Sequence, residues 1–71
     1  MTSHQYEWQN DYRAALIELN PKRLPTRIEK AEATIAARRL ALSSPVGHEE
    51  EIAALENAFR NLEILRRERA A

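Results

Sequence analysis

Apolar side chains recur along this sequence at spacings of three and four residues, which is the period of an amphipathic α-helix. The repeat is interrupted at residues 20–25, which hold two prolines, and at residues 43–48, which read Ser-Ser-Pro-Val-Gly-His. Proline disfavours helical geometry in the residue before it and lacks an amide donor. No segment alternates apolar and polar residues as a half-buried strand does. The pattern predicts an all-α fold, one domain over residues 1–71 with helices at about 5–19, 25–43 and 48–69.

Each predicted helix carries an apolar face, and these faces identify the expected core. The face comprises Trp8, Tyr12, Ala15, Leu16 and Leu19 on the first helix, and Leu24, Ile28, Ala31, Ile35 and Leu42 on the second. The second helix interrupts its own repeat at Arg38, or at Arg39 if the phase drifts. The third helix places Ile52, Ala54, Leu55, Ala58, Phe59, Leu62 and Leu65 within an arc of about 160°. One neighbour needs an arc of only about 100°, so we expect this helix to contact two.

Charge is unevenly distributed, although basic and acidic residues number 11 each. Residues 21–44 hold six basic and two acidic residues, whereas residues 45–65 hold one basic and five acidic residues. An antiparallel hairpin of the second and third helices would set these opposite charges side by side, at about 0–1 kcal/mol for each exposed pair. We therefore expect this hairpin, with the short N-terminal helix packed across it. Three glutamates, Glu49, Glu50 and Glu51, open the third helix as solvated charges that complement its dipole.

Further apolar residues lie outside the expected core. The second helix carries a second face of Ala33, Ala36, Ala37 and Leu40, which another helix could approach closely. Tyr6, Ile17, Leu40 and Ile64 are hard to place inside one monomer. Three short helices bury little apolar surface against the conformational entropy of 71 residues, and without cysteine no disulfide can assist.

These features predict a homodimer in which two hairpins form a four-helix bundle. The expected partner-binding residues are Trp8, Tyr12, Ala33, Ala37, Leu40 and Leu65. In the competing arrangement, a three-helix monomer, the first helix covers the wide apolar arc of the third through Trp8, Tyr12 and Leu16.

The sequence carries no motif typical of catalysis. A nucleophile needs an adjacent base and an orienting group, and the only histidines are His4 and His48. Gly47 is the only glycine, so a glycine-rich phosphate loop is excluded. His48 and the glutamates after it could suggest a metal site, but a helix start favours a solvated anion cluster there. We expect no enzymatic activity, no cofactor and no metal.

Two basic stretches could contact phosphate. They are Lys22, Arg23, Arg27, Lys30, Arg38 and Arg39 on the second helix, and Arg66, Arg67 and Arg69 at the C-terminus. The first is spread around its helix beside an acidic neighbour, and the second is short and interrupted by Glu68. A chain with zero net charge also lacks the positive field of a general nucleic-acid binder.

Location is constrained by what the sequence lacks. No apolar run approaches the roughly 20 residues that span a bilayer, and the first residues do not resemble a secretory signal. The absence of cysteine fits a reducing cytoplasm. We expect a cytoplasmic, non-catalytic protein–protein interaction or regulatory module that self-associates through helix faces. The alternative is a small nucleic-acid-associated accessory protein that uses the basic face of the second helix and the arginine-rich C-terminus.

One set of residues carries a resemblance. Trp8, Tyr12, Leu16 and Glu18, followed by Leu24-Pro25-x-Arg27-Ile28 and Ala31-Glu32, resemble small uncharacterised bacterial helical-hairpin proteins. The resemblance covers the first half of the chain and includes no catalytic motif. It implies a bacterial cytoplasmic protein, without implying an activity.

Overall fold

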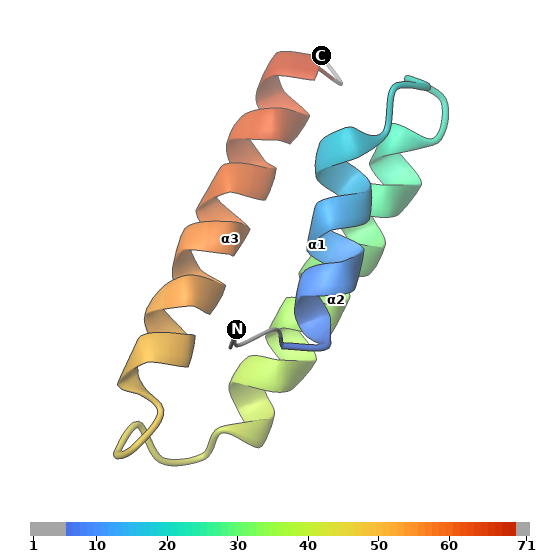
Figure 1. Ribbon diagram of the computed structural model, residues 1–71. Coiled ribbons are helices and arrows are strands. Elements are labelled where there is room, and N and C mark those ends of the chain that lie inside the picture. Colours follow the sequence, from blue (N-terminus) through green and yellow to red (C-terminus); the bar gives the residue numbers. More distant parts are fainter. Residues whose placement is uncertain (1–5, 70–71) are drawn as a thin grey trace, which may run out of the picture.

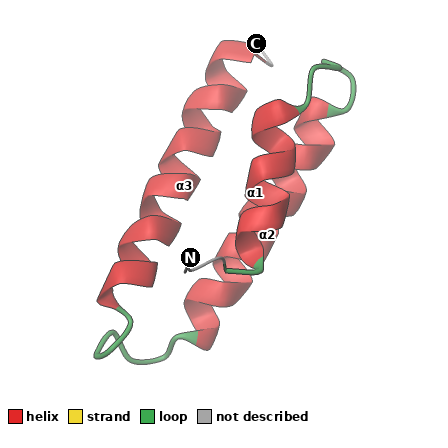
Figure 2. Ribbon diagram, in the orientation of Figure 1, coloured by secondary structure: helices red, strands yellow, loops and turns green. Residues whose placement is uncertain are grey.

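The computed structural model describes residues 6–69, which form three helices. They are α1 (Trp8–Ile17), α2 (Leu24–Ala41) and α3 (Glu49–Arg69). Each helix runs opposite to the one before it along the chain (Figure 1). Residues 6–69 contain no strand (Figure 2), and the prediction of an all-α fold is confirmed. None of these three helices has the length and hydropathy needed to cross a membrane.

The helix α1 is shorter than the predicted helix over residues 5–19. Residue 5 lies outside the described residues, and at the other end Glu18 turns to extended backbone with ψ 119°. Pro21 restricts only the residue before it, Asn20, and the chain already leaves the helix at Glu18, whose carboxylate accepts the backbone N–H of Asn20 at 3.1 Å. Leu19 therefore lies outside the helix and is 81% exposed, and Leu16 is 43% exposed. The prediction that these two leucines belong to the core is wrong.

Asn20 organises the short connection between α1 and α2. Its carbonyl oxygen accepts the backbone N–H groups of Arg23 at 3.0 Å and Leu24 at 3.1 Å. Its side-chain Oδ1 accepts the backbone N–H of Lys22 at 2.9 Å, an Asx-turn that the sequence Asn-Pro favours. Pro25 follows inside the first turn of α2, where a missing N–H costs little.

The connection between α2 and α3 contains the only residue with positive φ, Gly47 at 86°, among those described. Glycine adopts this left-handed conformation without the steric cost that a Cβ brings. The N–H of His48 donates to the carbonyl of Pro45 at 3.0 Å and closes the turn before α3. Two residues before the predicted end, α2 stops at Ala41, and Leu42 then leaves the helix while remaining buried.

The core lies where the three helices meet. It comprises Trp8, Ala15, Leu24, Ile28, Ala31, Ile35, Leu42, Ile52, Leu55, Ala58 and Leu62. All five apolar positions predicted for the second helix are buried: the four within α2 follow the helical period, and Leu42 lies directly after its end. The most extensive packing joins α1 to α2, and α3 packs on both. Contact of α3 with two neighbours agrees with its wide apolar arc.

Candidate functional site

A charged pair lies at the end of the core where α3 begins. Glu51 is only 5% exposed, and Arg38 of α2 donates to it twice, from Nε to Oε2 at 2.6 Å and from Nη2 to Oε1 at 3.0 Å. Trp8 of α1 donates its Nε1–H to the same Oε2 at 3.1 Å. One carboxylate therefore joins all three helices. Arg38 occupies the position at which the apolar repeat of α2 is interrupted.

The ionised form of this carboxylate is stabilised by its donors. The hydrogen bonds from Arg38 lower the pKa of Glu51 despite the opposing effect of burial, and the Trp8 N–H lowers it further. Reciprocally, Glu51 raises the pKa of Arg38. The prediction that Glu51 is a solvated charge is wrong, because the first turn of α3 places it against Arg38 and Trp8. Glu49 and Glu50 are exposed, as expected.

The Glu51 carboxylate has a structural role in this arrangement. Both oxygens of Glu51 accept hydrogen bonds from cationic or neutral donors, so the carboxylate is neutralised within the protein. Within residues 6–69, no three His, Cys, Asp or Glu side chains are grouped so that they could hold a metal ion. The Glu51 carboxylate therefore links the three helices through its hydrogen bonds.

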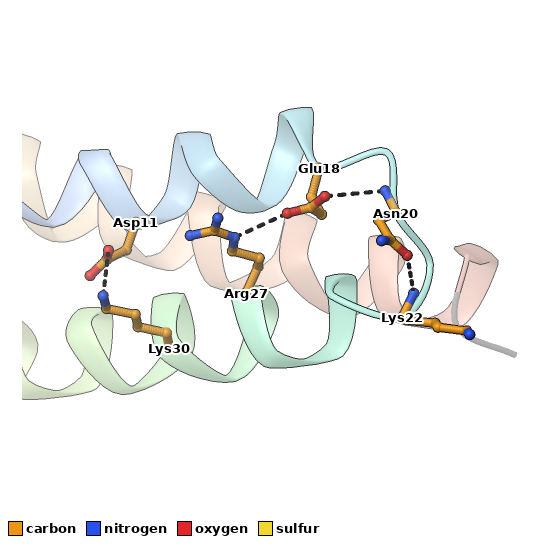
Figure 3. Close-up of polar contacts among 6 residues, drawn as sticks. All are labelled: Asp11, Glu18, Asn20, Lys22, Arg27 and Lys30. Carbon is orange, nitrogen blue, oxygen red and sulfur yellow. Dashed lines mark hydrogen bonds and ion pairs between the residues drawn. The ribbon is translucent and has the colours of Figure 1, made fainter.

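Polar contacts also connect α1 to α2 (Figure 3). Glu18 accepts the Nε–H of Arg27 at 3.1 Å through Oε1 and the backbone N–H of Asn20 at 3.1 Å through Oε2. The Asn20 N–H and then Arg27 lower the pKa of Glu18. Two turns earlier on α1, Asp11 lies 3.8 Å from Nζ of Lys30. These pairs place Asp11 and Glu18 on the side of α1 that faces α2. Leu16 lies on the opposite side of the helix and is therefore exposed.

The basic residues of α2 do not form one continuous face. Arg27, Lys30 and Arg38 pair with carboxylates, and Arg39 lines a groove on another side of the helix. Near the other end of α3, Arg66 donates to Glu32 at 2.7 Å. A separate pocket at the start of α2 is lined by Lys22, Arg23, Thr26, Arg27 and Lys30.

The α2–α3 groove is an open depression of about 390 Å³ to which only these two helices contribute. Its apolar lining residues are Ile35, Ala36, Leu55 and Phe59, and its charged ones are Arg39, Glu56, Arg60 and Glu63. Leu55 is buried beneath the groove, whereas Phe59 is 37% exposed. A partly exposed phenylalanine beside buried aliphatic side chains can accept a further apolar surface.

The six predicted partner-binding residues fall into two groups. Trp8, Tyr12 and Leu65 pack against the core of their own chain, whereas Ala33, Ala37 and Leu40 are exposed on α2. Trp8 is 3% exposed and stacks on Tyr6, with ring centroids 5.8 Å apart. Tyr12 is half-buried, and its hydroxyl accepts a hydrogen bond from Nδ2 of Asn61 at 2.9 Å. Trp8 therefore leaves almost no surface for a partner.

Of the residues that were hard to place in a monomer, Tyr6 is partly buried and packs against the core beside Trp8. Ile17, Leu40 and Ile64 are exposed, at 70%, 82% and 42%. The groove residues Ala36 and Phe59 are absent from the predicted binding set. Phe59 lies near one edge of the wide apolar arc of α3, but Ile52 lies still closer to that edge and is only 9% exposed, so the position in the arc does not by itself identify Phe59.

Comparisons with known proteins supply no relative from which a function could be transferred. No protein-family model matches the chain, and neither a curated protein nor a solved structure matches it.

Proposed function

We propose that this protein is a non-catalytic interaction module that self-associates through the α2–α3 groove. The observation that carries the proposal is the partial exposure of Phe59 beside the apolar residues of this groove. Removing apolar surface from water is the main driving force of protein association, at roughly 25 cal/mol per Å². A second copy would bring the same apolar surface to the groove.

The charges around the groove favour a second copy as the occupant. Arg39 and Arg60 are basic, and Glu56 and Glu63 are acidic, so the groove carries two charges of each sign. In a twofold dimer, the same patch faces itself. A patch of one sign would repel its copy, whereas a mixed patch can place opposite charges against each other. This balance supports a homodimer over a strongly charged partner.

The helix arrangement is compatible with such a dimer. Only α2 and α3 contribute to the groove, so α1 does not have to move for a second copy to dock. In the proposed dimer, α2 and α3 of both copies would form an antiparallel four-helix core, with α1 flanking on each side. Exposed Leu40 lies one turn beyond Ala36 on α2 and would extend the contact.

The test compares two substitutions on α3. Phe59→Glu places a charge in the groove, whereas Ile64→Glu places the same charge at a residue of similar exposure, 42% against 37%, that does not line it. Light scattering after size-exclusion chromatography measures the mass over a concentration series. We expect the wild type and Ile64→Glu to reach twice the monomer mass of 8.2 kDa, and Phe59→Glu to remain at the monomer mass.

Circular dichroism confirms that each variant is helical before its mass is interpreted. A wild type that stays at 8.2 kDa at every concentration would contradict self-association. Dissociation by Ile64→Glu with retention of the dimer by Phe59→Glu would place the interface on another face and contradict the groove.

A further inference from the structure

A second pocket, of about 400 Å³, lies along the first two turns of α2 and the residues just before them. We name it the cationic pocket, and its lining residues are Lys22, Arg23, Thr26, Arg27 and Lys30. We propose that the cationic pocket binds a phosphate dianion, the group that phosphate monoesters carry. This ligand site shares no residue with the α2–α3 groove, so it does not depend on self-association.

The charge of the cationic pocket matches this ligand. Of its four cations, Arg27 pairs with Glu18 at 3.1 Å and Lys30 lies at the longer distance of 3.8 Å from Asp11. Within residues 6–69, Lys22 and Arg23 form no ion pair. Two positive charges therefore remain uncompensated, and a phosphate monoester carries about −1.5 to −2 at neutral pH.

The donor groups also suit phosphate. Arg23 offers a planar guanidinium that can bind two phosphate oxygens at once, and the hydroxyl of Thr26 adds a further donor. Arg27 uses only Nε in its hydrogen bond to Glu18, and the Nη groups are separate donors. A phosphate group presents three acceptor oxygens to such donors, whereas a carboxylate presents two and carries a single charge.

The position of the cationic pocket is held by ordered contacts. Asn20 accepts the backbone N–H of Lys22 at 2.9 Å, and Glu18 accepts both the Asn20 N–H and Arg27 (Figure 3). The turn before α2 and the first turns of the helix are thereby connected to the end of α1. A preorganised site loses less conformational entropy when a ligand binds.

Acidic residues around the cationic pocket favour a compact anion over a nucleic-acid strand. Glu18, near the end of α1, and Asp11, within it, pair with the lining residues Arg27 and Lys30 and so lie beside the pocket. A nucleic-acid backbone repeats its charge along the strand and would meet these carboxylates. A single phosphate group would contact the cations alone.

The test is a titration of the ¹⁵N-labelled full chain with inorganic phosphate, observed by NMR at neutral pH and constant ionic strength. We expect saturable shifts of the amides over residues 22–30. Arg23→Gln should weaken binding by about tenfold or more, because it removes a charged hydrogen-bond donor. The matched control, Arg13→Gln, removes the same charge from an exposed position of α1 and should bind phosphate as the wild type does.

A change of pH tests the need for a dianion. Between about pH 8 and about pH 6, inorganic phosphate changes from mainly a dianion to mainly a monoanion whereas sulfate keeps two charges, so phosphate binding should weaken over this range and sulfate binding should not. Further arms compare glycerol 3-phosphate with vesicles that contain phosphatidic acid, and saturable binding of either supports the proposal and identifies a soluble or a lipid-borne phosphate.

Two results would overturn the proposal. The first is an equal response of the wild type and Arg23→Gln to phosphate and to chloride, which would be an ionic-strength effect. The second is binding of an oligonucleotide without terminal phosphate, with steep salt dependence and no displacement by inorganic phosphate. That second result would identify a nucleic-acid interface instead.

Discussion

Arg38 and Glu51 form an asymmetric ion pair, in which the side chain of the arginine is 43% exposed and that of the glutamate only 6%. The two hydrogen bonds, at 2.6 and 3.0 Å, connect the end of α2 to the first turn of α3. The carboxylate is the group that has been withdrawn from water, so it depends on its partner more than the guanidinium does. Removing one partner of such a pair leaves a charge without compensation.

Arg38→Met should therefore destabilise the fold. We expect the melting temperature, measured by circular dichroism, to fall by about 5–10 °C, because Glu51 keeps only the Trp8 N–H as a donor. Arg66→Met is the matched control, since it breaks an ion pair with Glu32 whose arginine side chain is 48% exposed. That change should shift the melting temperature by no more than about 2 °C. Equal shifts for the two variants would contradict the structural role of Arg38.

Acid should weaken the fold through Glu51. Its pKa lies below the ordinary value of 4.5 in the folded chain, so ionisation favours folding. This contribution is complete above pH 4.5 and is lost as the pH falls through the folded-state pKa. Urea unfolding of Glu51→Gln should show a smaller loss of stability between neutral pH and pH 3 than the wild type shows.

Trp8 provides the optical signal for this acid transition, because it is the only tryptophan and donates directly to Glu51. Glu50→Gln changes the adjacent, exposed residue and should retain the acid sensitivity of the wild type. A pH profile for Glu51→Gln that superimposes on those of the wild type and Glu50→Gln would show that other carboxylates govern acid unfolding.

The period of the apolar residues predicted the core positions of α2 correctly, but it did not show why the apolar repeat is interrupted at Arg38. Arg38 could have been an exposed edge of the helix or one half of a buried pair, and its partner lies 13 residues away on another helix. Glu51 belongs to a run of three glutamates, and the helical period places it on the apolar face of α3, four residues before Leu55, although a solvated helix start was expected for all three. The local sequence determines which residues share one face of a helix, whereas the pairing of Arg38 with Glu51 depends on how α2 and α3 pack against each other.

The apolar face predicted for α1 was partly wrong for the same reason, because spacing alone does not show which residues pair with another helix. Both Asp11 and Glu18 point toward α2 because Lys30 and Arg27 lie opposite them, and Leu16 is turned outward as a result. Apolar spacing alone favoured Leu16. The α2–α3 groove was not predicted for a related reason. The width of the apolar arc of α3 does not show which edge of the arc remains uncovered by neighbouring helices.

Leu55 and Phe59 lie one turn apart on α3, and their substitutions should have different consequences. Leu55 is 1% exposed, so Leu55→Ala should cost about 2–5 kcal/mol, which is close to the whole stability expected of so small a domain. Phe59 is 37% exposed at the groove, so Phe59→Ala should cost less. From the apolar arc alone, both substitutions would be expected to unfold the chain.

Thermal melts of the two variants at low concentration, where association contributes little, measure the difference. We expect Leu55→Ala to be largely unfolded at 37 °C and Phe59→Ala to remain folded. Equal destabilisation would mean that Phe59 is a core residue and that the groove is closed in solution.

The last prediction tests whether the mixed charges of the groove select a second copy. Glu56→Lys with Glu63→Lys makes all four charges positive, and Arg39→Glu with Arg60→Glu makes all four negative. Like charges that face each other oppose association, so each double variant should self-associate about tenfold or more weakly than the wild type.

Mixed together, the two double variants should form a one-to-one complex, because an all-positive groove then faces an all-negative one. Sedimentation of each variant alone and of the equimolar mixture measures this. Glu50→Lys with Glu68→Lys makes the same change of net charge as Glu56→Lys with Glu63→Lys, but at exposed positions outside the groove, and it should leave self-association close to that of the wild type. If the two variants stay monomeric in the mixture while the wild type dimerises, the dimer cannot be formed by one groove facing another.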